Sequence, residues 1–150
     1  MDKIDVAIIR CLTEDARMNA SQIGARVSLS VSAVIERMKK LEASGLIRGY
    51  TAVIDESKAG FSTQALISIR LEHPKYNESF NTQMCAHPSV TECFYITGDF
   101  DYMARVVVSS GEELTKVLND IKQFPGVSLT RTYVVLETVK QDTPVIPKTQ

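Results

Sequence analysis

The chain has 150 residues, a formal net charge of −1 at pH 7, and 44% hydrophobic and 23% charged residues. These values are typical of a folded globular protein with one ordinary or two small domains, and they exclude an intrinsically disordered chain. No apolar run approaches the roughly 20 residues that a membrane helix needs, so no membrane partner is expected. The start of the chain lacks the plan of a signal peptide.

The three cysteines Cys11, Cys85 and Cys93 match neither a CxxC motif nor a zinc-ligand spacing. Each has apolar neighbours at helix or strand spacing, so we expect core-filling roles rather than reactive ones. Free thiols of this kind are usual in a reducing compartment, and a cytoplasmic location is the expectation.

Three short amphipathic helices are predicted in the first 45 residues. The first covers residues 3–13, with Asp2 as its N-cap. The second begins near Asn19, and the third follows the N-cap residue Ser30 and ends at Gly45. A short helix pair of this kind is typical of a helix-turn-helix, whose second helix can enter a DNA major groove.

Residues 46–54 follow with β-prone side chains and are expected to form a wing or an exit strand. They complete a predicted winged helix-turn-helix domain over residues 1–54. A polar, glycine-containing linker is predicted at residues 55–63.

Local positive charge favours DNA contact by this helix pair. Residues 16–50 hold six Arg and Lys against two Glu, a net +4 on a chain whose total is −1. Small residues let a helix approach base edges, and cations reach phosphates. An ordinary solvated helix face is the alternative. The residues expected near bases are Ser30, Ser32, Ala33 and Glu36, and those expected near the phosphates of double-stranded DNA are Arg17, Arg37 and Lys40.

The second half shows strands and helices in the order βαββαβ over residues 64–140, before a tail at 141–150. Strands are predicted at 65–71, 90–97, 102–108 and 127–139, separated by helical stripes. This order is that of a ferredoxin-like antiparallel sheet with two helices on one face, so the whole chain is expected to be α+β.

The other face of that sheet needs a cover, and a second copy of the same sheet is a natural one. Tyr95, Thr97, Thr130 and Thr132 are the semi-polar residues expected on it. A homodimer also suits a helix-turn-helix, because symmetric DNA half-sites require two-fold protein symmetry.

Motifs in both halves resemble those of the leucine-responsive regulatory protein (Lrp)/AsnC family, in the family's order and over residues 2 to about 140. The motifs are Asp5-x-x-Ile8-Ile9, Asp15-Ala16-Arg17, Ser30, Arg37, Leu41-Glu42, Gly45-Leu46-Ile47, Gly49-Tyr50, Gly98-Asp99-Phe100-Asp101-Tyr102, Pro125-Gly126-Val127 and Thr130-Arg131-Thr132-Tyr133-Val134-Val135. Two positions depart from the family pattern. Ile23-Gly24 replaces the usual Leu-Ala, and Ser28 stands where Gly is common.

The resemblance implies a transcription regulator whose winged helix-turn-helix binds DNA and whose ferredoxin-like domain dimerises and senses an amino acid. It also implies assembly of dimers into tetramers or octamers, with the effector between dimers and no other cofactor. Leucine and methionine are the first expectations for the effector.

The loop between the second and third strands is the effector loop that the resemblance implies. From composition alone, Gly98 and Asp99 form a hairpin turn. With the resemblance, a carboxylate such as Asp101 can pair with an α-ammonium group, and backbone N–H groups can hold the carboxylate. Two carboxylates alone make a poor metal site. The effector-binding residues expected are Ile96, Gly98, Asp99, Phe100, Asp101, Tyr133 and Val134.

An enzyme on the same two-domain architecture, similar to the sirohaem decarboxylases, is the alternative function. It would need residues to grip an acidic tetrapyrrole. His73 and His87 are the only histidines, and each adjoins a proline at the end of an element. The sequence has no nucleophile–base constellation, no phosphate-binding glycine loop and no metal motif, so no enzymatic activity is expected.

Overall fold

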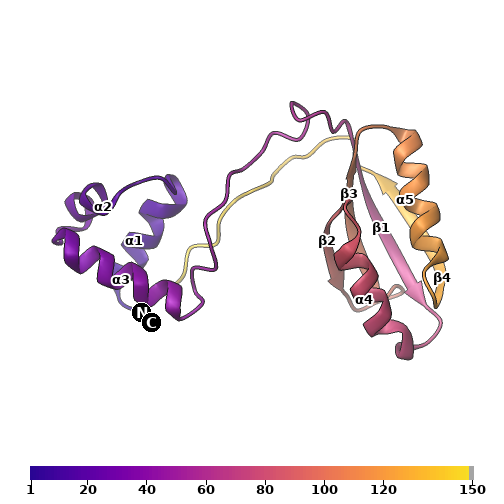
Figure 1. The fold of residues 1–150 in the computed structure, drawn as a ribbon, viewed down its shortest axis with the longest axis horizontal. Coiled ribbons are helices and arrows are strands. Elements are labelled where there is room, and N and C mark those ends of the chain that lie inside the picture. Colours follow the sequence, from indigo (N-terminus) through magenta and orange to yellow (C-terminus); the bar gives the residue numbers. More distant parts are fainter. Residues whose placement is uncertain (149–150) are drawn as a thin grey trace. The chain divides into compact units, whose positions relative to one another are not determined.

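The computed structural model describes residues 1–148, which form two compact units joined by the chain (Figure 1). The first unit comprises Met1–Val53 together with the C-terminal segment from Lys140, and the second comprises Ile54–Val139. Each unit has a hydrophobic core of its own.

The first unit is a bundle of three helices, α1 (Lys3–Glu14), α2 (Ala20–Val27) and α3 (Val31–Ala43). Their apolar stripes meet in a small core around the fully buried Ile8, Ile23 and Val34. This arrangement is the predicted helix-turn-helix. Its formation follows from amphipathic spacing, because helices this short gain most of their stability from packing.

The predicted helix starts are confirmed by their caps. The Asp2 carboxylate accepts from the backbone N–H of Asp5 at 2.8 Å, and the Asp5 carboxylate accepts from the N–H of Asp2 at 2.8 Å. Asn19 and Gln22 form the same reciprocal pair at the start of α2. Satisfying two otherwise unpaired N–H groups fixes where each helix begins.

In the turn between α2 and α3, the backbones of Gly24 and Leu29 approach each other closely. Ser28 adopts a left-handed conformation with φ 56° and ψ 45°, and the N–H of Leu29 donates to the carbonyl of Gly24 at 3.0 Å. A Cβ atom at position 24 would lie 2.6 Å from the carbonyl oxygen of Leu29. Gly24 therefore permits a backbone approach that alanine would obstruct.

The strand predicted at residues 46–54 is wrong, because this segment is irregular and largely exposed. A strand needs a neighbour to pair its backbone N–H and C=O groups. Within the first unit the segment pairs with no strand, so its β-prone side chains do not produce one.

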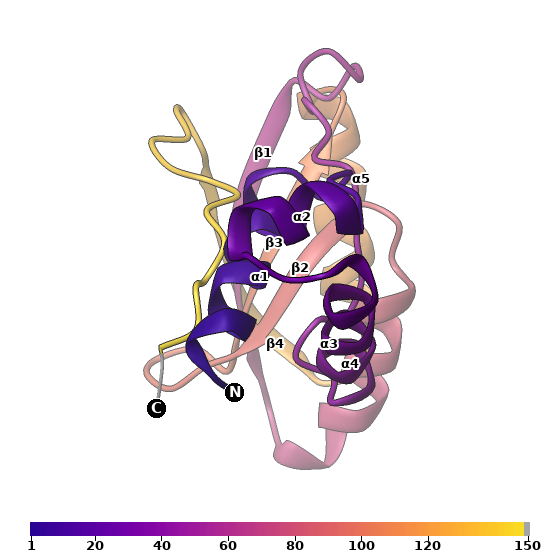
Figure 2. The same cartoon turned by 90° about the vertical axis from the view of Figure 1, so that its left-hand side faces the viewer.

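The second unit is a four-stranded antiparallel sheet in the order β2-β3-β1-β4, with two helices on one face (Figures 1 and 2). In chain order it contains β1 (Thr63–Leu71), a 3-10 turn (Pro74–Tyr76), α4 (Asn77–Ala86), β2 (Val90–Tyr95), β3 (Tyr102–Val108), α5 (Gly111–Gln123) and β4 (Val127–Val134). The ferredoxin-like βαββαβ fold is confirmed.

The last strand, β4, is shorter than predicted. It ends at Val134, which lies opposite Ala65 near the start of β1. One further hydrogen bond joins the N–H of Val135 to the carbonyl of Gln64 at 2.9 Å. Because the strands are antiparallel, the residues that follow run past the start of β1 at Thr63 and find no strand to pair with. The β-prone residues up to 139 therefore leave the sheet.

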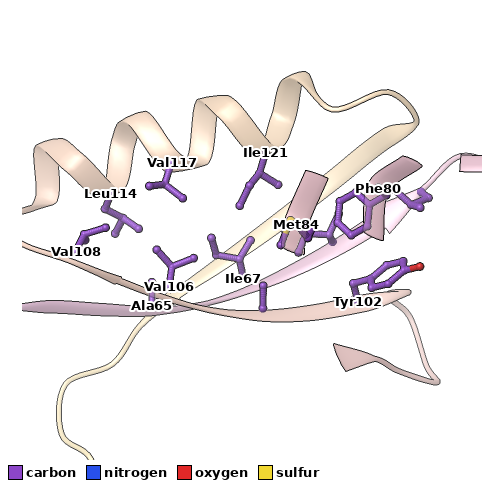
Figure 3. Close-up of a cluster of buried hydrophobic side chains, with 13 residues drawn as sticks. Ala65, Ile67, Phe80, Met84, Tyr102, Val106, Val108, Leu114, Val117 and Ile121 are labelled. Atoms are coloured by element: carbon purple, nitrogen blue, oxygen red, sulfur yellow. The ribbon is translucent and has the colours of Figure 1, made fainter. Parts of the chain in front are cut away.

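The core of this unit lies between the sheet and the helix layer (Figure 3). Ile67, Phe80 and Ile121 are fully buried there, and the rings of Phe80 and Tyr102 lie 4.6 Å apart. Core-filling roles hold for the buried Cys11 and the partly buried Cys93. They do not hold for Cys85, which is exposed on α4.

The open face of the sheet carries large apolar side chains that differ from those predicted. Directly opposite residues of an antiparallel pair share a face. Thr130 and Thr132 lie opposite the buried Ile69 and Ile67, so both point to the helix side, as does Tyr95 opposite Tyr102, and Thr97 lies beyond β2. The exposed large hydrophobic residues on the open face are Leu66, Phe94, Leu129 and Tyr133.

Part of the segment predicted as a linker is held on the sheet. Glu56 forms an ion pair with Arg105 at 2.8 Å, with side chains only 24% and 14% exposed. The amide of Gln64 donates to the same carboxylate at 2.8 Å. Within the described residues, no helix is long and apolar enough to cross a membrane.

Candidate functional sites

The outer face of α3 is the candidate surface for a duplex. Ser32, Glu36 and Lys39 are exposed along it, and Val31 and Ile35 are also exposed, to 46% and 42%. Residues four apart on a helix are neighbours, so these side chains form two adjacent rows. The buried Val34 and Leu41 mark the opposite side of the helix.

The predicted base-contacting residues lie at the start of this face. Ser30 caps α3, and its hydroxyl oxygen accepts from the N–H of Ala33 at 3.3 Å and lies 3.2 Å from the Ser32 hydroxyl. Ala33 is half-buried on the flank. Ser32 and Glu36 are exposed on the outer side of the helix.

Lys40 pairs with Glu36 one turn earlier, with Nζ 2.6 Å from the carboxylate. This hydrogen bond lowers the pKa of Glu36. Both side chains are more than two-thirds exposed, so water screens the pair and little free energy opposes its opening. Lys40 can therefore exchange its partner for a phosphate.

Arg37 is engaged within the protein. Its Nη1 lies 2.7 Å from a carboxylate oxygen of Asp2 and 2.7 Å from one of Asp5, and its side chain is 30% exposed. The backbone N–H of Asp5, followed by Arg37, lowers the pKa of Asp2. The structure thus places Arg37 as a link between α3 and the start of α1, not on the outer face.

The remaining predicted cation, Arg17, lies outside α3 in the turn before α2 and is exposed. Sequence reasoning missed Lys39, Val31 and Ile35. Counting 100° per residue from the buried Val34 places Lys39 at about 140° and Ile35 at about 100°, towards the exposed arc, but Val31 at only about 60°.

The loop between β2 and β3 is ordered by backbone contacts. Ile96 N–H donates to the carbonyl of Asp101 at 2.8 Å, and Asp101 N–H donates to the carbonyl of Ile69 at 3.0 Å. Gly98 has φ 123°, which only glycine adopts readily. The predicted turn and its Gly98 requirement are therefore both present.

Asp101 also has a structural contact. Its Oδ2 accepts from the backbone N–H of Leu71 at 2.7 Å. That N–H belongs to the position where the β1–β4 register shifts, between Arg70 and Leu71. The carboxylate thus supplies a partner to a donor that the irregular ladder leaves out.

Two arginines flank the aromatic residue of this loop. The guanidinium carbons of Arg70 and Arg131 lie 5.4 Å and 5.3 Å from the centroid of Phe100. Arg70 also donates through Nε to the carbonyl of Asp99 at 2.8 Å. Sequence reasoning had not assigned either arginine to the loop.

Tyr133 and Val134 do not join the loop within one protomer. They lie opposite Leu66 and Ala65. The loop contacts the other end of β1, at Ile69 to Leu71. The nearest of these positions, Leu66 and Ile69, are three residues apart, about 10 Å along the strand. The predicted effector residues therefore divide into the loop group and this pair.

Family models match both units. The model described as the AsnC-type helix-turn-helix domain matches residues 1–42, and the model described as the Lrp/AsnC ligand binding domain matches residues 64–145. The chain belongs to the Lrp/AsnC family. It is a transcriptional regulator with a DNA-binding helix-turn-helix and a ligand-binding domain.

Similar proteins include other Lrp/AsnC regulators over nearly their full length. The leucine-responsive regulatory protein of Escherichia coli K12 is 35% identical, over 100% of this chain and 93% of the relative. The transcriptional regulator FL11 of Pyrococcus horikoshii is 34% identical, over 95% of this chain and 94% of the relative.

Solved Lrp/AsnC structures also share the fold. The Mycobacterium tuberculosis leucine response regulatory protein LrpA gives a TM-score of 0.86 at 31% identity, covering 98% of this chain and 100% of that one. The Neisseria meningitidis regulator NMB0573, solved as a complex with L-Met, gives 0.90 at 28% identity, covering 96% of both chains.

The decarboxylase alternative receives no support from these Lrp/AsnC relatives. Both histidines serve as local backbone acceptors, since Nδ1 of His73 accepts from Lys75 N–H at 3.1 Å and Nδ1 of His87 from Ser89 N–H at 3.3 Å. Across residues 1–148 no group of three or more potential metal ligands occurs.

Proposed function

We propose that this regulator controls transcription in response to a small amino acid, with leucine or methionine as the first candidates, and that it has no enzymatic activity. The observation that carries the proposal is the uncovered outer face of α3 in a matched helix-turn-helix, in one chain with a matched ligand-binding domain. Such a chain can couple ligand binding to occupancy of double-stranded DNA.

We propose that the first level of assembly is a homodimer formed through the open face of the sheet. Leu66, Phe94 and Tyr133 expose large apolar surface there. Several large apolar side chains exposed on one sheet face are a usual mark of an interface. A second copy provides a self-complementary cover and presents two α3 helices to two DNA half-sites. Tetramers or octamers would then form from these dimers.

The effector site that we propose lies at the β2–β3 loop, between dimers. Its carboxylate-binding part consists of the backbone around Gly98 with the guanidinium of Arg131. Charge-assisted hydrogen bonds of this kind are the stronger ones. Asp99 is the exposed carboxylate of the loop and Asp101 the anchored one. Either can accept from a ligand ammonium, and Ile96 and Phe100 offer apolar contact to its side chain.

Two arguments favour an amino acid as the effector. The loop places carboxylates and guanidinium groups close together, which matches a zwitterion. The Neisseria meningitidis relative has been solved with L-Met. Since Tyr133 and Val134 lie about 10 Å or more along the strand from the loop, we assign Tyr133 to the dimer face and propose effector contact for the loop residues.

The test is a thermal-shift screen of the full-length protein against each common L-amino acid, followed by DNA titrations with and without each hit. A specific ligand at about 100 times its Kd stabilises the folded state by about 2.7 kcal/mol. The D-enantiomer of each hit is the matched control. Light scattering of the same samples measures assembly. If no amino acid raises Tm, or a hit leaves DNA affinity and assembly unchanged, amino-acid control is refuted.

A further inference from the structure

Two large apolar side chains are exposed on one flank of α3, beside its outer face. Val31 is 46% exposed and Ile35 is 42% exposed, while the apolar residues on the inner side, Val34 and Leu41, are buried. Val31 and Ile35 are four residues apart, so their side chains are neighbours one turn from each other. Together they form an apolar patch in the first turns of α3.

The surroundings of this patch are polar and basic. Ser32 and Glu36 lie about 100° further round the helix than the two apolar residues, and Lys39 lies one turn beyond Ile35. Lys40 lies one turn beyond Glu36, with an exposed ion pair that opens readily. A protein partner that covers an apolar patch does not need this rim of cations, whereas a duplex with phosphates on both sides of its groove does.

The position of the patch matches the part of a helix-turn-helix that approaches bases. In this motif the N-terminal residues of the second helix meet the base edges in the major groove. Val31 and Ile35 fall in that part of α3. The major groove presents one apolar group to a protein, the C5-methyl group of thymine.

We propose that Val31 and Ile35 determine specificity by contacting thymine methyl groups in the major groove. The proposal rests on the DNA binding proposed above and names what this part of the site recognises. The side chains make no hydrogen bonds, so their preference depends on the methyl group and not on the base-pairing edge. They add to contacts that Ser32 and Glu36 make with polar base atoms.

The expected effect follows from the size of one methyl group. Burial of a CH₂-sized group changes affinity by about four-fold. Deoxyuridine differs from thymidine only by this methyl group and keeps the same hydrogen-bonding atoms. Replacing a contacted thymine by deoxyuridine should therefore weaken binding by about four-fold.

The experiment begins by selecting a duplex from a random pool with the full-length protein. Each thymine of the selected half-site is then replaced singly by deoxyuridine, and Kd is measured at fixed salt. The unmodified protein should lose about four-fold in affinity at one or two thymines. The double variant Val31→Ala/Ile35→Ala should bind the thymine and deoxyuridine duplexes equally. Both changes are on the surface and alanine favours helix, so the variant should fold, which circular dichroism checks.

Lys39→Ala is the matched control on the same face. It should weaken binding to all duplexes alike, lower the dependence of affinity on salt, and keep the difference between thymine and deoxyuridine. The proposal is overturned if the unmodified protein is indifferent to every deoxyuridine, or if the double variant keeps the full difference. A protein that selects no duplex at all refutes the proposed DNA binding itself, which is a separate result.

Discussion

Gly24 and Ser28 allow a sharp test of how α2 is joined to α3. In Gly24→Ala the new Cβ would meet the Leu29 carbonyl oxygen at 2.6 Å, closer than a carbon and an oxygen normally approach. Alanine favours helix over glycine by about 1 kcal/mol. Overpacking against backbone costs about 1–3 kcal/mol. The net expectation is destabilisation of the first unit by about 1 kcal/mol.

The same contact couples position 24 to position 28. Ser28 holds a left-handed conformation, which costs a residue with a Cβ about 1–2 kcal/mol. Ser28→Gly should relieve that cost and free the turn to move the Leu29 carbonyl away. The double variant Gly24→Ala/Ser28→Gly should therefore be more stable than the sum of the single effects predicts, by about 0.5 kcal/mol or more.

The assay is urea unfolding of the full-length variants followed by circular dichroism, with DNA affinity measured in parallel. Gly49→Ala is the matched control, because a Cβ there meets nothing within 4 Å and the residue has no positive φ. It should leave stability within about 0.5 kcal/mol of the parent. If Gly24→Ala instead stabilises the protein by the full helix propensity, the close approach of the two backbones is refuted.

Three further predictions concern single side chains. Asp101→Ala should destabilise the second unit by about 1–3 kcal/mol in urea unfolding, because it leaves the Leu71 N–H without its partner, and Asp99→Ala should not; equal stability of the two variants would remove the structural role. Arg37→Ala should lower Tm and DNA affinity while the salt slope stays that of the parent, since the guanidinium binds carboxylates of α1; a slope smaller by about one would show a phosphate contact instead. Hydrogen bonds from the hydroxyl and the backbone N–H of Ser109 hold the pKa of Glu113 below its usual 4.5. The stability they add is present above pH 4.5 and is lost as the pH falls through the lowered pKa. Glu113→Gln should therefore be less stable than the parent at neutral pH, and a stability difference that does not shrink on acidification would contradict this.

Local sequence signals predicted the helix-turn-helix well. The caps at Asp2, Asn19 and Ser30 depend on residues three positions away, so they are readable in a short window. The pairing of Arg37 with carboxylates more than 30 residues earlier is not readable in this way, and it engages a side chain that was predicted to contact phosphate. Long-range ion pairs depend on how helices dock, which periodicity does not specify.

In the sheet, too, local patterns were readable from the sequence and long-range pairing was not. Alternating residues predicted the strands and their order, but the identity of the open face depended on which residues lie opposite each other. A shift of one residue moves every side chain to the other face. For this reason Thr130 and Thr132 were assigned to the wrong side, while Leu129 and Tyr133 occupy the open face. Within one protomer Val134 lies opposite Ala65, away from the loop, and sequence spacing does not give this distance along a paired strand.

Strand β1 has attachments at both ends, and this has a mechanical consequence. At one end Arg70 and Leu71 hold the β2–β3 loop, and at the other Gln64 holds Glu56. Gln64 and Arg70 are six residue steps apart, about 20 Å of backbone paired on both sides. At the effector site proposed above, a ligand that displaces the loop would act on one end of this paired strand, whose other end holds Glu56.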